Sequence, residues 1–144
     1  MKSIAKLLLL LSVFAIGLSA CSKEKRIERQ LIKKEGKWKI TSIDYKYYVN
    51  NNLQQSSNYP NAGTIEFNKN GTFVMTITVD GSPEVFGGNW TNSKDEVTLI
   101  SDGEASILKI TDGPKKDKMV LEGTEYNNGT GEKDVYTYYL ERAD

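Results

Sequence analysis

The sequence contains no histidine and only one cysteine, Cys21. The absence of histidine removes the commonest general base and transition-metal ligand, together with every serine-histidine or cysteine-histidine nucleophile. A single cysteine excludes a disulfide within the chain and a thiolate zinc site. Only carboxylate, lysine or tyrosine chemistry is left, so we expect no enzyme activity, no catalytic residues, no metal and no cofactor.

The N-terminal hydrophobic run is too short to span a membrane as a helix, which needs about 20 apolar residues. The run covers residues 7–18, follows two lysines and ends in small residues before Cys21. This layout is typical of a secretion signal. We therefore expect residues 1–20 to be a signal peptide that is removed from the mature protein.

Residues 18–21, Leu-Ser-Ala-Cys, resemble the lipobox of bacterial lipoproteins, whose cysteine becomes the lipidated first residue of the mature protein. The resemblance implies a palmitate-type anchor on Cys21 and attachment to a membrane of the cell envelope. Ser22 stands in place of the aspartate that marks inner-membrane retention in enterobacteria. We therefore expect the outer membrane, on either its periplasmic or its surface face. The alternative is an unmodified Cys21 beside an ordinary cleavage site.

Neither sign of charge dominates the chain, because 19 basic side chains balance 19 acidic ones. The basic residues are not interleaved with aromatic residues on one face, so we expect no binding of nucleic acid. Positive charge is concentrated in residues 22–39, which hold eight basic and three acidic side chains. Within this segment Ile27, Leu31 and Ile32 have helical spacing. We expect residues 21–35 to form a short helical tether. It either stays solvated, lies against anionic headgroups, or docks through Ile27 and Leu31 on the following domain.

From residue 36 onward the hydrophobic pattern has a period of two, and turn sequences recur along the chain. The pattern predicts eight strands, with a bulge near Thr41 and Ser42. It also predicts a long polar loop over residues 50–61 and a turn at residues 112–114. The expected strands cover residues 36–49, 64–67, 72–80, 84–91, 96–100, 105–111, 118–126 and 133–141.

Consecutive strands joined by short turns favour an antiparallel up-and-down meander, and closing eight strands into a barrel would remove the exposed sheet edges. The interior of such a barrel is just wide enough to be filled by side chains or to hold one small ligand. We therefore expect an all-β, eight-stranded antiparallel barrel after the signal peptide and helical tether. An open sandwich is the alternative.

Residues 36–38, Gly-Lys-Trp, resemble the G-x-W signature that opens the first strand of lipocalins. Arg142, at the end of the last strand, resembles the arginine that packs across that tryptophan. Residues 63–72 and 88–90 are similar to the lipocalin-like lipoproteins of Bacteroidetes. The resemblance implies a lipocalin-like barrel domain over residues 36–142. Arg142 over the Trp38 indole would close the barrel structurally, through a cation–π attraction of about 0.5 to 2 kcal/mol.

The inward faces of the expected strands carry many large apolar and aromatic side chains. In a hollow barrel they would line a lumen for a small hydrophobic or amphipathic ligand. In a filled barrel, loops and outer surface would instead engage a protein partner, as an inhibitor or interaction module at the cell surface or in the periplasm. We expect the acidic pairs Asp102 with Glu104 and Glu122 with Glu125 to face water. The candidate lumen residues are Phe67, Phe73, Met75, Phe86, Trp90, Leu108, Tyr136 and Tyr138.

Overall fold

The computed structural model describes residues 23–127 and 129–144. The expected signal peptide, residues 1–20, and the expected lipidation site, Cys21, lie outside the described residues. Within the described part of the chain, no helix is both long and apolar enough to cross a membrane.

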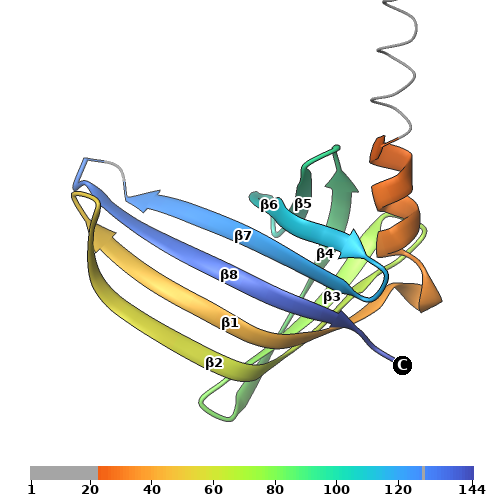
Figure 1. Cartoon of the computed structure of the whole chain (residues 1–144), viewed down its shortest axis with the longest axis horizontal. Coiled ribbons are helices and arrows are strands. Elements are labelled where there is room, and N and C mark those ends of the chain that lie inside the picture. The colour runs from red at the N-terminus through yellow and green to blue at the C-terminus, as the bar shows by residue number, and fades with distance from the viewer. Residues whose placement is uncertain (1–22, 128) are drawn as a thin grey trace, which may run out of the picture.

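Eight antiparallel strands make up most of this part of the chain, and each pairs with its neighbours in the sequence. The first strand also pairs with the last, from Trp38 opposite Arg142 to Val49 opposite Glu132. The sheet is therefore a closed up-and-down barrel (Figure 1), which confirms the predicted fold class and excludes the open sandwich. The strands are β1 (Lys37–Val49), β2 (Asn52–Phe67), β3 (Thr72–Val79), β4 (Ser82–Asn92), β5 (Glu96–Ser101), β6 (Glu104–Lys115), β7 (Lys118–Asn127) and β8 (Glu132–Arg142).

The bulge predicted in the first strand is present. The pairing of β1 shifts in register between Ile40 and Ser42 on both of its edges. Because of this extra residue, Ile40 and Ile43 both point into the core although they are three positions apart, and they are 1% and 5% exposed. The bulge therefore explains the change of phase in the sequence pattern.

The predicted polar loop over residues 50–61 is wrong. Only Asn50 and Asn51 form the turn, with φ angles of 49° and 63°, and residues 52–61 are the first part of β2. Most side chains in this part of β2 are exposed. Pairing with β1 satisfies the backbone groups, so the segment is a strand without a buried face. Its sequence consequently shows no apolar alternation that could have revealed it.

The turn predicted at residues 112–114 is also wrong, because β6 continues to Lys115. The pairing between β6 and β7 shifts in register on both sides of Asp112. Gly113 has a φ of 83°, which suits a bulge as well as a turn. The chain reverses at residues 116–117 instead, so the local sequence was that of a bulge within a longer strand.

The hydrophobic core lies at one end of the barrel, and a helix over residues 23–31 packs across that end (Figure 1). Ile27 and Leu31 of the helix are buried in the same cluster as Trp38. The segment is therefore docked on the barrel, and burying these two side chains contributes about 3 to 6 kcal/mol. A short 3-10 helix, η1 (Lys34–Gly36), leads into β1. Residues 23–127 and 129–144 thus contain the closed barrel, its core and the helix that covers it, and we expect residues 23–144 to fold as one unit.

Arg142 fastens the helix to the barrel. Its guanidinium carbon lies 3.7 Å from the centroid of the Trp38 ring, and it donates to the carbonyl oxygens of Gln30 at 2.7 Å and Lys33 at 3.0 Å. The Trp38 indole Nε1 donates to the carbonyl oxygen of Leu31 at 3.1 Å. Carbonyls at the end of a helix lack partners within it and favour a positive charge nearby. The first strand, the last strand and the helix are therefore joined at one point.

Candidate ligand-binding site at the open end of the barrel

The end of the barrel opposite the helix is open. At two places around the barrel, between β6 and β7 and between β2 and β3, neighbouring strands are hydrogen-bonded over only part of their length. β6 and β7 pair from Leu108 opposite Gly123 towards the helix, and residues 104–107 and 124–127 lie beyond this pairing. β2 and β3 pair only from Gly63 onward. The long strands β1, β2, β7 and β8 therefore continue as a curved sheet past the closed ring (Figure 1).

A pocket of ≈ 440 Å³, which we call the open-end pocket, lies between strands β3 to β8. Six of its thirteen lining residues carry apolar aliphatic or phenyl side chains. Its volume falls in the range of small-molecule sites, about 300 to 1,000 Å³. The lining residues are Phe73, Met75, Ile77, Glu84, Phe86, Leu99, Ser101, Asp102, Glu104, Ser106, Leu108, Glu125 and Tyr138.

A smaller side pocket of ≈ 260 Å³ lies where β6 and β7 separate, and Gly123 and Tyr136 are among its lining residues. Four residues belong to both pockets, so the two are adjoining parts of one hollow. The hollow therefore reaches the side of the barrel as well as its end. The shared residues are Ser106, Leu108, Glu125 and Tyr138.

The eight candidate lumen residues fall into three groups. Phe67 and Trp90 fill the core, with their rings packed edge to face at 5.3 Å, and the Trp90 indole donates to the carbonyl oxygen of Asn68 at 3.0 Å. Tyr136 lines the side pocket. The barrel is therefore filled near the helix and hollow at the other end. The remaining five line the open-end pocket: Phe73, Met75, Phe86, Leu108 and Tyr138.

Tyrosines occupy the inner face of β1 and β8. The rings of Tyr45 and Tyr136 lie 5.2 Å apart, and the Tyr45 hydroxyl donates to the Asp134 carboxylate at 2.7 Å. This hydrogen bond raises the pKa of Tyr45 to about 12, and burial raises the pKa of Tyr138 to about 12. Both phenols therefore stay neutral at physiological pH. Tyr138, which lines both pockets, can offer a hydroxyl and a ring face to a ligand.

Carboxylates surround the opening of the open-end pocket, in the form of Glu84 on β4, Glu104 on β6, Glu125 on β7 and Asp102 in the β5–β6 turn. We expected the last three to face water and did not identify them as pocket residues. The alternation along β6 could have indicated Glu104 as an inward-facing residue, since Glu104 lies an even number of positions from Leu108. In the described part of the chain, no group of three or more carboxylates could hold a metal ion.

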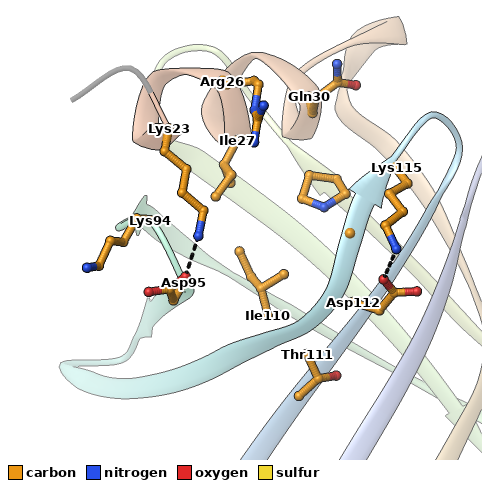
Figure 2. A pocket seen from close by; sticks show the side chains of 12 residues that line it. Lys23, Arg26, Ile27, Gln30, Lys94, Asp95, Ile110, Thr111, Asp112 and Lys115 are labelled. Atoms are coloured by element: carbon orange, nitrogen blue, oxygen red, sulfur yellow. Dashed lines mark hydrogen bonds and ion pairs between the residues drawn. The ribbon is translucent and has the colours of Figure 1, made fainter. Parts of the chain in front are cut away.

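A third pocket, also of ≈ 440 Å³, lies at the other end of the barrel between the helix and the β5 and β6 region (Figure 2). The Lys23 ammonium lies 2.8 Å from the Asp95 carboxylate and lowers the pKa of that carboxyl group. The Lys115 ammonium lies 2.7 Å from Asp112. This polar pocket marks the contact between helix and barrel, and it lacks the apolar wall of the open-end pocket.

No family model and no curated protein matches this chain. Among solved structures, the chain is similar to lobster apocrustacyanin A1, with 16% sequence identity and a TM-score of 0.48, over 84% of this chain and 68% of that chain. It is similar to apocrustacyanin C1 with 13% identity and a TM-score of 0.48, over 83% and 69% of the two chains. The architecture follows from the strand order of the chain, which forms a closed barrel of eight strands in sequence order. Lipocalins have the same eight-stranded up-and-down barrel architecture.

Proposed function

We propose that this chain is an envelope lipoprotein whose lipocalin-like barrel binds one small hydrophobic or amphipathic molecule without catalysis. The observation that carries the proposal is the ≈ 440 Å³ open-end pocket, in which six of the thirteen lining side chains are apolar. Pockets with an apolar wall and a few polar groups are typical of small-molecule sites. The same pocket argues against a filled barrel that acts on a protein partner only through its outer surface.

The contact between Trp38 and Arg142 supports placing the chain with the lipocalin-like lipoproteins of the Bacteroidetes type. Arg142 lies over the Trp38 ring and joins the last strand to the first. This is the structural role that the resemblance implies for the pair. Gly36 is the last residue of η1 and directly precedes β1, and Trp38 is the second residue of β1, so the G-x-W sequence lies where the first strand begins.

The helix end of the barrel is the end that an anchor on Cys21 would hold at the outer membrane. The described helix begins at residue 23, and residues 22–39 carry eight basic side chains against three acidic ones. Each basic residue near an anionic membrane surface contributes about 1 kcal/mol of attraction. In this arrangement the open-end pocket points away from the membrane.

Replacing Cys21 with alanine is expected to release the protein from the membrane, because the acyl chain can no longer be attached. The measurement is fractionation of cells grown with labelled palmitate. The native chain should sediment with outer membranes and carry the label, whereas the variant should do neither. Ser22→Ala is the matched control and should behave like the native chain. A native chain that is soluble and unlabelled would contradict the anchor.

Replacing Ser106 with phenylalanine is expected to raise the dissociation constant of a neutral hydrophobic probe, N-phenyl-1-naphthylamine, at least about tenfold, or about 1.4 kcal/mol. Ser106 lines both pockets and is exposed, so a phenyl ring there occupies the hollow without displacing the core. Fluorescence titration of the probe measures the change.

Val85→Phe is the control for this variant. Val85 lies next to the pocket residues of β4 but is 69% exposed, on the outer face of the strand. A phenyl ring there should leave probe binding unchanged. If the probe binds Ser106→Phe as tightly as the native chain, or binds none of the three proteins, the proposed site is wrong.

A further inference from the structure

We propose that the ligand of the open-end pocket is a cationic amphiphile, meaning an apolar chain or ring system that carries an amine or quaternary ammonium group. This inference rests on the proposed ligand-binding function and adds the sign of the ligand's charge. It is carried by the charges and rings that line the pocket, together with its apolar wall.

Among the described residues that line the hollow, every charged side chain is acidic. Glu84, Asp102, Glu104 and Glu125 line the open-end pocket, Glu125 also lines the side pocket, and neither lining includes a lysine or an arginine from this part of the chain. These carboxylates come from β4, β6, β7 and the β5–β6 turn, so they surround the opening instead of gathering on one strand. Within residues 23–127 and 129–144, none of the four takes part in an ion pair.

The basic side chains lie elsewhere. Eight of them fall in residues 22–39, at the helix end. Near the open end, Lys46 and Lys133 project from the outer face of the sheet, and the Lys133 ammonium lies 4.9 Å from the centroid of the Tyr48 ring. The negative potential of the opening is therefore not offset by a cation in the pocket lining. An opening lined by charges of one sign and walled by apolar groups concentrates ions of the opposite sign.

Aromatic rings stand beside these carboxylates. Phe86, which is 41% exposed, and Tyr138 line the open-end pocket, and Tyr136 lines the side pocket. A cationic head group is attracted to such ring faces as well as to carboxylates. Met75 and Leu108 are 9% and 6% exposed and offer a buried apolar surface to the rest of the ligand. An anionic amphiphile such as a fatty acid would instead bring another negative charge into the same opening.

The test compares three amphiphiles with matched alkyl chains and different head groups: dodecyltrimethylammonium, dodecyl maltoside and dodecanoate. Each is titrated below its micellar concentration into residues 23–144, and calorimetry measures the dissociation constant. We expect the cation to bind at least about tenfold more tightly than dodecanoate, with the neutral maltoside between them. This ratio should shrink when salt rises from about 0.01 M to about 1 M, because the Debye length falls from about 30 Å to about 3 Å.

A paired variant tests whether the pocket selects the charge. Glu104→Gln together with Glu125→Gln removes two carboxylates from the opening and should reduce the ratio of the two affinities at least about threefold. The control pair is Glu96→Gln with Glu122→Gln, which makes the same change on the outer face of β5 and β7. The control should keep the native ratio. Circular dichroism verifies that both double variants are folded.

Equal affinity for the three amphiphiles, or tighter binding of dodecanoate, would overturn the cationic ligand and leave the proposed binding function intact. Equal loss of the preference in the pocket variant and in the control would also overturn it, because net charge would then explain the selection. If none of the amphiphiles binds and the neutral naphthylamine probe does not bind either, the proposed function itself fails.

Discussion

Replacing Arg142 with alanine is expected to lower the free energy of unfolding by about 4 kcal/mol and to release the helix over residues 23–31 from the barrel. The guanidinium donates to the carbonyl oxygens of Gln30 and Lys33, and a hydrogen bond to a charged group contributes about 1.5 to 3 kcal/mol. Its contact with the Trp38 ring adds about 0.5 to 2 kcal/mol. Urea unfolding measures the stability, and amide hydrogen exchange reports on the helix.

Arg29→Ala is the matched control for this experiment. Arg29 is an exposed arginine of the same helix, so its loss should change the stability by less than about 0.5 kcal/mol. Arg142→Lys keeps the charge, but it should lower the free energy of unfolding almost as much as Arg142→Ala does. An ammonium group cannot stack flat on an indole while it donates to two carbonyl oxygens. If Arg142→Ala is as stable as Arg29→Ala and the helix amides stay protected, the fastening role of Arg142 is wrong.

Gly36→Ala is expected to lower the free energy of unfolding by at least about 3 kcal/mol. Gly36 has a φ of 71°, which costs an alanine about 1 to 2 kcal/mol. In addition, a Cβ atom at this position would overlap the backbone carbonyl oxygen of Phe67. The neighbouring Trp38 and Leu31 are completely buried, so the backbone cannot move aside without opening the core. Urea unfolding of the native chain and the variant measures the loss.

Gly81→Ala separates the two causes of this loss. Gly81 has a φ of 81°, but a Cβ atom there would meet nothing within 4 Å. Its replacement should therefore cost only the conformational strain, about 1 to 2 kcal/mol. The difference between the two variants measures the overlap at Gly36. Equal losses at the two glycines would show that the close approach to Phe67 has no energetic consequence.

These two variants give the G-x-W resemblance a physical content. The glycine is needed because Gly36 passes against the backbone of Phe67 with a positive φ. The tryptophan is needed because Trp38 fills the end of the barrel, bonds to the helix through its indole nitrogen and supports Arg142. Both residues stabilise the closed end, so they are expected to affect ligand binding only through the stability of the fold.

The period of two in the sequence located strands wherever one face is buried. Strand β3, expected over residues 72–80, is observed from Thr72 to Val79, because Phe73 and Met75 alternate with more exposed neighbours. The same rule missed residues 52–61, which are held in β2 by pairing with β1 and not by burial. Hydrogen bonds to a partner strand leave no trace in the hydrophobicity of a segment, so this part of the fold was not predictable.

The site shows a similar division. Leu108 and Tyr138 were recognisable as inward-facing residues from their alternation within each strand. Whether such side chains meet and fill the barrel depends on where pairing stops, and β6 separates from β7 beyond Leu108 and Gly123. The acidic opening depends on the same separation, because it leaves Glu104 and Glu125 beside a pocket. We expected both carboxylates to face water, although Glu104 is in phase with Leu108, and their proximity in the pocket depends on the tertiary structure.

The all-β class, the eight strands and the bulge in the first strand were predictable from the amino-acid sequence, because alternation of apolar residues is a property of neighbouring positions in the chain. In contrast, the docking of the helix over residues 23–31, the filling of one end by the core and the acidic pocket at the other end became clear from the three-dimensional arrangement of the strands. These three features depend on contacts between segments that are far apart in the sequence. Which side chains meet there depends on the register and length of each strand pairing, and the sequence of a single segment does not specify that.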